Sequence, residues 1–182
     1  MVDRAKQVDR DHFYMGLARA VREGADCLGS HVGAVLVVGN RAISTGFNGT
    51  PEGFPNCSDG GCVRCRDSAC YRDGLTHEAI DPEHVPGRGL DRCICVHAEQ
   101  NAIITAARFG IRVDGATLYT TLSPCFGCLK EAVQAGIVRV VYDDEYQTPM
   151  SEPVRRQYDA LARHLAGGDP TAFERLAPVT SG

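Results

Sequence analysis

HAEQNAIITAAR, residues 97–108, begins with a histidine and a glutamate and continues as a run rich in alanine and isoleucine. This composition predicts a buried helix over residues 98–108. His97 and Glu99 then lie at its first turn, where the positive end of the helix dipole favours nearby negative charge. The segment therefore offers a metal ligand and a carboxylate together at the start of one helix.

SPCFGC, residues 123–128, predicts the start of a second helix. Ser123 is a typical N-cap residue, and Pro124 would take the first helical position, where proline is favoured. Cys125 and Cys128 are three positions apart, so their side chains share one face of that helix. We expect both helices to point their N-termini at one metal ion, because positive helix ends favour thiolates.

One histidine and two cysteines make a catalytic zinc site, because a structural site normally has four protein ligands. Zinc held in this way lowers the pKa of a water in the open position, so hydroxide is available at neutral pH. Glu99 is then free to move protons as a general acid and base. The paired motifs are typical of zinc-dependent nucleobase deaminases. The alternatives are a redox-active or structural-zinc Cys-x-x-Cys and a solvated helix start at His97.

The composition is that of an ordinary globular protein: 182 residues, 43% of them hydrophobic, with a formal net charge of −4. This length predicts a single domain over residues 1–182. No apolar run reaches the ~18 residues of a membrane span, and residues 1–6 lack the apolar core of a signal peptide. We therefore expect a cytoplasmic protein without membrane association, whose nine cysteines are thiols or metal ligands. The acidic balance disfavours nucleic acid as a partner.

Hydrophobic periodicity predicts helices and strands that alternate around a mixed sheet. The expected helices are 11–22, 98–108 and 124–136, and the expected strands are 32–38, 42–46, 116–121 and 138–142. A Cys-rich insertion at about residues 51–95 has no clear periodicity, so it needs some other source of order. The tail at about residues 151–182 predicts two helices, over 151–165 and 169–176, in place of a regular fifth strand. The sheet edge would then need another cover, such as a neighbouring subunit.

Short segments between about residues 12 and 146 match one known family. They are VGAV (32–35), GFNGTP (46–51), NC (56–57), GGCVRC (60–65), CICVHAEQNA (93–102), LYTT (118–121), PCFGC (124–128), QAGI (134–137) and VY (141–142). These segments resemble the deoxycytidylate (dCMP) deaminase family of the cytidine deaminase-like superfamily, and the cysteine motifs are most similar to its fungal-type branch. The resemblance implies an α/β protein with the three-layer α/β/α cytidine deaminase-like fold, in which helices flank a central mixed sheet.

The resemblance also implies how a substrate would be held. Asn48 would hydrogen-bond the 3′-hydroxyl of the sugar, and the backbone amide of Ala98 would hold the pyrimidine O2. The carbonyl of Ser123 would accept a hydrogen bond from the exocyclic amine, and Tyr146 would pack near the base or the phosphate. A few fixed polar groups in an apolar pocket suffice to orient such a ring.

Many members of this family are hexamers that dCTP activates and dTTP inhibits, through sites near an Asn-Gly-x-Pro loop. This chain keeps the loop at residues 48–51 but has Phe47 where tyrosine is more usual. The resemblance therefore implies a homo-oligomer, a hexamer or a dimer, with dCTP and dTTP as candidate effectors.

Six further cysteines lie in or next to the insertion: Cys27, Cys57, Cys62, Cys65, Cys93 and Cys95. Some family members hold a second, structural zinc with cysteines at positions that match Cys27 and Cys57. Cys62-x-x-Cys65 also has zinc-knuckle spacing, and Cys93-x-Cys95 can complete a set. We therefore expect a second, closed zinc site that uses four of the six cysteines and orders the insertion. Free thiols are the alternative.

The expected function is hydrolytic, zinc-dependent deamination of a cytosine nucleotide, dCMP to dUMP and ammonia, for thymidylate synthesis. One alternative is a deaminase for another cytidine nucleotide or a modified cytosine in a specialised pathway. A tRNA or free-base deaminase shares the zinc motifs, although the charge and the loop at residues 48–51 disfavour it. The non-enzymatic alternative is a zinc-stabilised binding module, which would have no need of Glu99.

Overall fold

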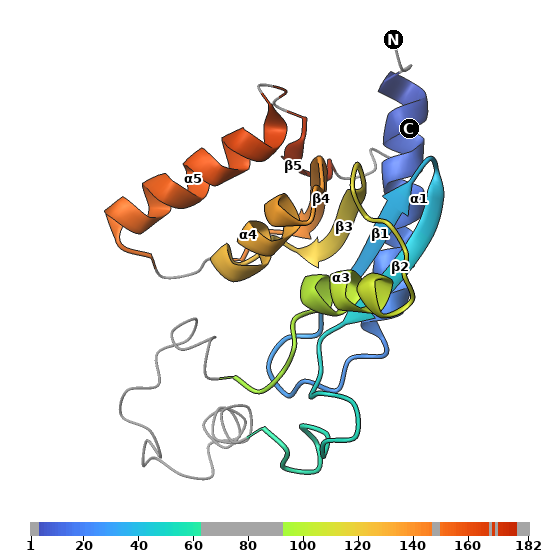
Figure 1. The fold of residues 1–182 in the computed structure, drawn as a ribbon, viewed down its shortest axis with the longest axis vertical. Coiled ribbons are helices and arrows are strands. Elements are labelled where there is room, and N and C mark those ends of the chain that lie inside the picture. Colours follow the sequence, from blue (N-terminus) through green and yellow to red (C-terminus); the bar gives the residue numbers. More distant parts are fainter. Residues whose placement is uncertain (1–3, 63–92, 147–149, 168, 170, 178–182) are drawn as a thin grey trace.

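The structure is a computed structural model and describes residues 4–62, 93–146, 150–167, 169 and 171–177. Four helices and five strands alternate along these residues (Figure 1). In chain order they are α1 (Arg4–Arg22), β1 (Gly33–Val38), β2 (Arg41–Phe47), α3 (Ala98–Arg108), β3 (Thr117–Leu122), α4 (Phe126–Gln134), β4 (Arg139–Asp144), α5 (Glu152–Ala166) and β5 (Phe173–Arg175). None of the described helices is long and apolar enough to cross a membrane.

The five strands form one mixed sheet in the order β2-β1-β3-β4-β5. Strand β1 runs antiparallel to both of its neighbours, and β3, β4 and β5 are parallel. Strands β2, β3 and β4 therefore point the same way, and their carboxyl ends lie side by side at one end of the strands. Ligand sites of open α/β sheets form at that end.

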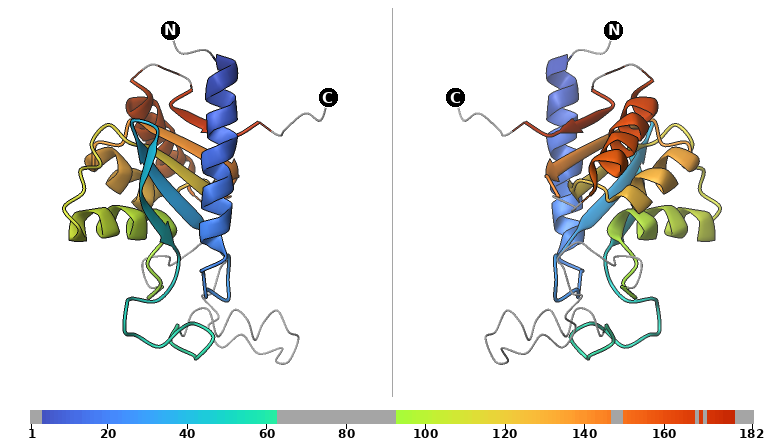
Figure 2. Two further views of the ribbon diagram at one scale, coloured as in Figure 1. Left: turned by 90° about the vertical axis from the view of Figure 1, so that its right-hand side faces the viewer. Right: turned by 90° about the vertical axis from the view of Figure 1, so that its left-hand side faces the viewer.

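Helices cover both faces of the sheet, as the side views show (Figure 2). On one face α1 packs against Val35 and Val37 of β1 and Tyr119 of β3. On the other face α3 and α4 bury the alternate residues, among them Leu36 and Leu118. This alternation is the period-two pattern of a strand buried on both sides. The three-layer α/β/α prediction is confirmed.

The sequence prediction of helix α4 is wrong at its start. Cys125, and not Ser123, is the N-cap, and its sulfur accepts a hydrogen bond from the backbone amide of Cys128. Ser123 instead continues the strand pairing, because its amide donates to the carbonyl of Asp144 at 2.8 Å. Its hydroxyl accepts from the amide of Tyr146 at 2.7 Å. The end of the parallel strand pair therefore takes Ser123 away from the helix.

The prediction that residues 169–176 form a helix, with no regular fifth strand, is also wrong. Strand β5 pairs in parallel with β4, so that Val140 lies opposite Phe173. The amide of Val140 donates to the carbonyl of Ala172, and the amide of Leu176 donates to the carbonyl of Tyr142, both at 2.7 Å. The exposed edge of β4 explains the outcome, because unpaired backbone groups gain hydrogen bonds from an added strand. The chain thus covers this edge itself.

Candidate active site

Three side chains predicted to bind the catalytic zinc converge in the structure. His97 Nδ1 lies 3.5 Å from Cys125 Sγ and 3.3 Å from Cys128 Sγ. For tetrahedral zinc with ordinary Zn–N and Zn–S bonds, the N···S separation is about 3.6 Å. These residues, called the metal trio below, therefore fit a zinc ion without rearrangement.

Two helix ends place the metal trio. His97 is the N-cap of α3, and its backbone amide donates to Gln100 Oε1 at 3.0 Å. Cys125 is the N-cap of α4, and Cys128 is buried in the first turn of that helix. Both helix N-termini thus face the metal position, as the sequence predicts, and their dipoles favour thiolates there.

The three side chains of the metal trio differ in their pKa values. Hydrogen bonding by the Cys128 thiol lowers the pKa of Cys125 to about 4. Hydrogen bonding to Cys125 raises the pKa of Cys128, and burial acts in the same direction. Hydrogen bonding to Cys125 raises the pKa of His97 to about 9. Near neutral pH the trio therefore carries one thiolate and two protonated ligands, and zinc binding displaces two protons.

Glu99 lies on the same turn of α3 and is almost completely buried, with 4% of its surface exposed. Burial raises the pKa of this carboxyl, while its own backbone amide and the charge of His97 act in the opposite direction. Thr120 of β3 places its hydroxyl 3.4 Å from Glu99 Oε1. Glu99 is thus a buried acid beside the metal position, with the raised pKa that a proton-transfer group needs.

A pocket of about 150 Å³ lies at the carboxyl ends of β3 and β4, and its lining among the described residues reaches Ser123 and Pro124 but none of the metal trio. Ser123 and Pro124 form the wall next to Cys125. Aromatic and charged side chains form the rest of the lining: Tyr142, Glu145, Tyr146, Arg155, Tyr158, Asp159 and Phe173, with Met150. This mixture of flat apolar surfaces and a few polar groups suits a small cyclic ligand.

The four predicted substrate contacts lie around this region. Ser123 and Tyr146 line the pocket. Ala98 is fully buried at the first position of α3, where a backbone amide has no partner within the helix. Asn48 follows β2, and its side chain accepts from the amide of Val32 and donates to the carbonyl of Ser30, each at 2.7 Å. Those two bonds fix the Asn48 amide and leave one N–H and one lone pair for a ligand.

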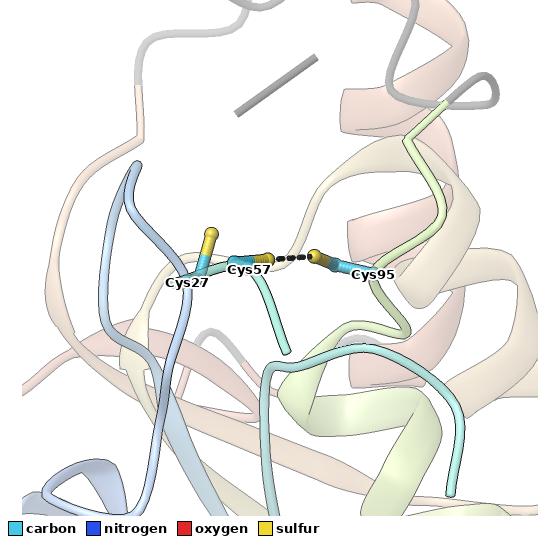
Figure 3. A group of neighbouring side chains, drawn as sticks. All are labelled: Cys27, Cys57 and Cys95. Atoms are coloured by element: carbon cyan, nitrogen blue, oxygen red, sulfur yellow. Dashed lines mark hydrogen bonds between the residues drawn. The ribbon is translucent and has the colours of Figure 1, made fainter. Parts of the chain in front are cut away.

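The predicted second metal set is gathered in part. Cys27, Cys57 and Cys95 form one three-ligand group, and Cys62, Cys93 and Cys95 form another (Figure 3 shows the first). Cys65 lies outside the described residues. Burial raises the pKa of Cys95, with hydrogen bonding to Cys57 as the next cause. A metal at this thiol would have to displace its proton.

The sequence predicts a helix over residues 151–165 but does not reveal that its Tyr158 contacts the site. The Tyr158 hydroxyl donates to the carbonyl of Pro124 at 2.8 Å. Its ring packs edge-on against Phe126 and Phe173. Helix α5 therefore clamps the loop that carries Cys125. The apolar face of α5 predicts that the helix is partly buried. The residues that it packs against depend on where β5 pairs, which no local pattern shows.

A three-ligand metal trio beside a buried, unliganded carboxylate defines a catalytic type of zinc site, because one coordination position is open. Residues 8–143 match the sequence model of the cytidine and deoxycytidylate deaminase zinc-binding region. The chain belongs to the cytidine and deoxycytidylate deaminase family.

Named relatives and a solved structure agree. The chain is 38% identical over 142 residues to deoxycytidylate deaminase of Mycobacterium phage D29, covering 75% of this chain and 96% of the phage protein. It is 39% identical over 137 residues to the Schizosaccharomyces pombe enzyme, covering 75% of this chain but 37% of that protein. The crystal structure of cyanophage S-TIM5 dCMP deaminase with dCMP and dUMP superposes with a TM-score of 0.60 at 26% identity. That match covers 96% of this chain and 98% of the other. The chain thus spans little more than a third of the first fungal relative and almost the whole of the phage proteins.

Proposed function

We propose that this protein deaminates dCMP hydrolytically, so that dCMP and water yield dUMP and ammonia for thymidylate synthesis. The observation that carries the proposal is the metal trio with Glu99 buried in the first turn of the helix that His97 caps. The relatives named deoxycytidylate deaminase support the substrate. A non-catalytic zinc module would gain nothing from burying a carboxylate there, since burial of an unpaired acid is unfavourable.

The chemistry divides between the metal and the chain. His97, Cys125 and Cys128 would hold a zinc ion, which would lower the pKa of water so that hydroxide is available as the nucleophile at neutral pH. Glu99 would accept the proton of the attacking water and deliver it to N3 of the ring. It would then take the proton of the new C4 hydroxyl and pass it to the amino group, which leaves as ammonia while the C4 oxygen becomes the carbonyl of dUMP. Its burial keeps the carboxyl pKa high enough to donate as well as accept a proton.

The surrounding residues hold the nucleotide. The Ala98 amide holds O2 of the ring, and the Ser123 carbonyl accepts from the exocyclic amine. Asn48 binds the 3′-hydroxyl with the donor and acceptor that its own bonds to the backbone leave over. Tyr146 lines the pocket beside the base or the phosphate. Hydrogen bonds to the backbone hold Asn48 and Ser123 in place, so little order has to be gained at these two positions on binding.

The test is to measure ammonia release from dCMP, CMP, dCTP, deoxycytidine, cytosine and a tRNA anticodon stem. We expect the highest kcat/KM with dCMP, and a 10²- to 10⁴-fold loss in a zinc-loaded Glu99→Gln variant. Turnover of another cytidine nucleotide, of free cytosine or of tRNA in preference to dCMP would assign the substrate to an alternative. No turnover with zinc bound would favour a binding module.

We also propose a structural zinc among the cysteines of the insertion. In residues 51–62 the buried side chains are Cys57 and Cys62, while residues 51–60 are otherwise exposed. A segment with so little apolar burial needs another source of order, which metal ligation supplies. The predicted set of four ligands is drawn from Cys27, Cys57, Cys62, Cys93 and Cys95, with Cys65 outside the described residues.

Regulation and assembly are proposed from the family resemblance. A homo-oligomer, a hexamer or a dimer, would be consistent with the exposed side chains of Phe47 and Phe54, which flank the loop at residues 48–51. We expect dCTP to activate and dTTP to inhibit. Light scattering gives the subunit number, and initial rates with added dCTP or dTTP test the effectors. A monomer that neither nucleotide affects would contradict this part of the proposal.

A further inference from the structure

Five cysteines outside the metal trio come together from three separate segments. Cys27 follows α1, Cys57 and Cys62 follow β2, and Cys93 and Cys95 precede α3. Four of the five are buried, and Cys93 is half-buried. Figure 3 shows Cys27, Cys57 and Cys95 meeting where the three segments lie next to one another. Thiolates are soft ligands of the kind that zinc prefers, so this concentration of sulfur within the described residues suits a metal.

The cluster is built as two groups of three that share one member. The sulfurs of Cys27, Cys57 and Cys95 all lie within 4.8 Å of one another, and so do those of Cys62, Cys93 and Cys95. Two of the pairs are close: Cys57 Sγ to Cys95 Sγ is 3.1 Å, and Cys62 Sγ to Cys93 Sγ is 3.7 Å. Around tetrahedral zinc, two thiolates stand about 3.8 Å apart. Each group thus has the size of one face of a zinc tetrahedron.

We propose that this cluster binds two zinc ions, with the sulfur of Cys95 as a bridge between them. The proposal rests on the structural zinc proposed above and adds the second ion and the bridge. One tetrahedral ion accepts at most four thiolates, so a single zinc would leave one of the five thiols without a metal. Two ions that share Cys95 give each ion three sulfur ligands. The fourth position of each is open to water.

Charge balance favours the two-ion arrangement. Four thiolates around one divalent zinc carry a net charge of about −2, whereas five thiolates around two zinc ions carry about −1. The smaller charge is easier to bury, because an uncompensated buried charge is strongly unfavourable. The remaining thiol of the single-zinc arrangement would in addition stay protonated beside that charge.

The backbone around the cluster is already fixed for ligation. Asp26 accepts a hydrogen bond from the Ser58 hydroxyl at 2.8 Å, which joins the segments that carry Cys27 and Cys57. A tight turn brings Cys62 back towards Cys57, and a Cβ on Gly61 would stand 1.8 Å from the carbonyl of Pro55. Such supporting contacts orient metal ligands before the metal binds.

The cluster also lies next to the segment of chain that leads into the active site. Cys95 lies two residues before His97, and Val96 between them pairs with Gly49 in an antiparallel bridge. The Val96 amide donates to the Gly49 carbonyl at 2.8 Å, and the reverse bond is 3.2 Å. A bridged pair of ions would therefore fix His97 and the Asn48 loop relative to each other. Its role is positional, because none of the five thiols belongs to the metal trio.

The experiment is metal analysis of the full chain purified without chelator. We expect three zinc ions per chain in the wild type. Cys27→Ser and Cys62→Ser are each expected to lose one ion, whereas Cys95→Ser loses two because both groups share its sulfur. His97→Ala loses one ion from the metal trio and serves as the matched control for a single-site loss.

Cadmium replacement keeps the test decisive if Cys95→Ser does not fold. In wild-type protein loaded with ¹¹³Cd, two thiolate-rich signals with mutual scalar coupling support the sulfur bridge. Two zinc ions per chain, with one uncoupled cadmium signal from the cluster beside that of the metal trio, would overturn the bridge and leave the single structural zinc intact. A mass two hydrogens lower with one zinc per chain would indicate a disulfide and overturn both. Ammonia release from dCMP is measured on the same samples, so failure of the proposed activity is seen separately.

Discussion

Replacing Gly46 by alanine tests whether the spacing between β2 and α3 sets the position of Glu99. Gly46 lies under the first turns of α3, and a Cβ there would stand 2.3 Å from the carbonyl oxygen of Ala98 and 2.4 Å from the amide of Ala102. A Cβ contact essentially never falls below 3.0 Å, and ordinary contact begins at 3.4 Å, so the helix backbone must move by about 0.7 to 1.1 Å. Both neighbours are backbone atoms, which cannot rotate away.

A displacement of about 1 Å in a catalytic group lowers activity by about 10²-fold. We therefore expect kcat/KM of Gly46→Ala with dCMP to fall by about that factor, with about 1–3 kcal/mol lost from the free energy of unfolding. The assays are initial rates of ammonia release and urea unfolding. Gly16→Ala in α1 is the matched control, because its Cβ meets nothing within 4 Å and alanine favours a helix. Unchanged kcat/KM and stability in Gly46→Ala would refute the claim that this contact positions Glu99.

Three further perturbations test other parts of the structure. Tyr158→Phe leaves the Pro124 carbonyl without its 2.8 Å donor, so we expect about 1–3 kcal/mol lower stability in urea unfolding and a reduced kcat; an unchanged kcat would show that α5 does not order the metal loop. Asp11→Ala removes one of the two carboxylates that Arg139 contacts, the other being Glu174, and it also removes the acceptor of the Tyr119 hydroxyl. We expect a loss of about 1–3 kcal/mol in urea unfolding while kcat of the folded protein is kept, since these groups lie on the α1 face; loss of kcat with intact stability would contradict this. Zinc titration of chelator-treated protein at pH 7 is expected to release two protons at the metal trio, so its zinc affinity falls about 100-fold for each unit that pH drops between 5 and 8. Calorimetry in buffers of different ionisation enthalpy measures the number of protons released. The same titration of His97→Ala gives the contribution of the other thiols, which is subtracted. A release of no protons would disprove the protonation states assigned to the metal trio.

Much of the site could be predicted because it depends on short-range patterns. His97 and Glu99 are separated by one residue at a helix start, and Cys125 and Cys128 by one helical turn. Their geometry is therefore set within each helix, and the chemistry of a shared zinc implies that the two helix ends meet. Helix α3 has the predicted bounds for the same reason, since local composition decides it.

The errors lie where long-range pairing overrides local preference. Asp169 and the residues after it look like a capped helix, and the Thr171 amide does donate to Asp169 Oδ1 at 2.8 Å. The edge of β4 nevertheless draws residues 173–175 into the sheet, because two backbone hydrogen bonds to a strand edge outweigh a weak helical preference. The start of α4 differs from the prediction for the same reason, because the amide of Ser123 donates to the carbonyl of Asp144. Neither partner is near in sequence, so no local pattern could reveal it.

The loop at residues 48–62 is where sequence and structure explain each other best. Its first residue binds back to β1 and carries the proposed sugar contact, and its remaining length has almost no apolar burial. An ordinary loop of this kind would be held by its ends alone, yet Gly49 pairs with Val96 directly before His97. The order required at the active site must then come from Cys57 and Cys62, the buried anchors of the segment. Because metal ligation supplies order that a segment with so little apolar burial lacks, removing metal from the cluster should loosen the Asn48 loop and His97 together, even if the metal trio keeps its own zinc.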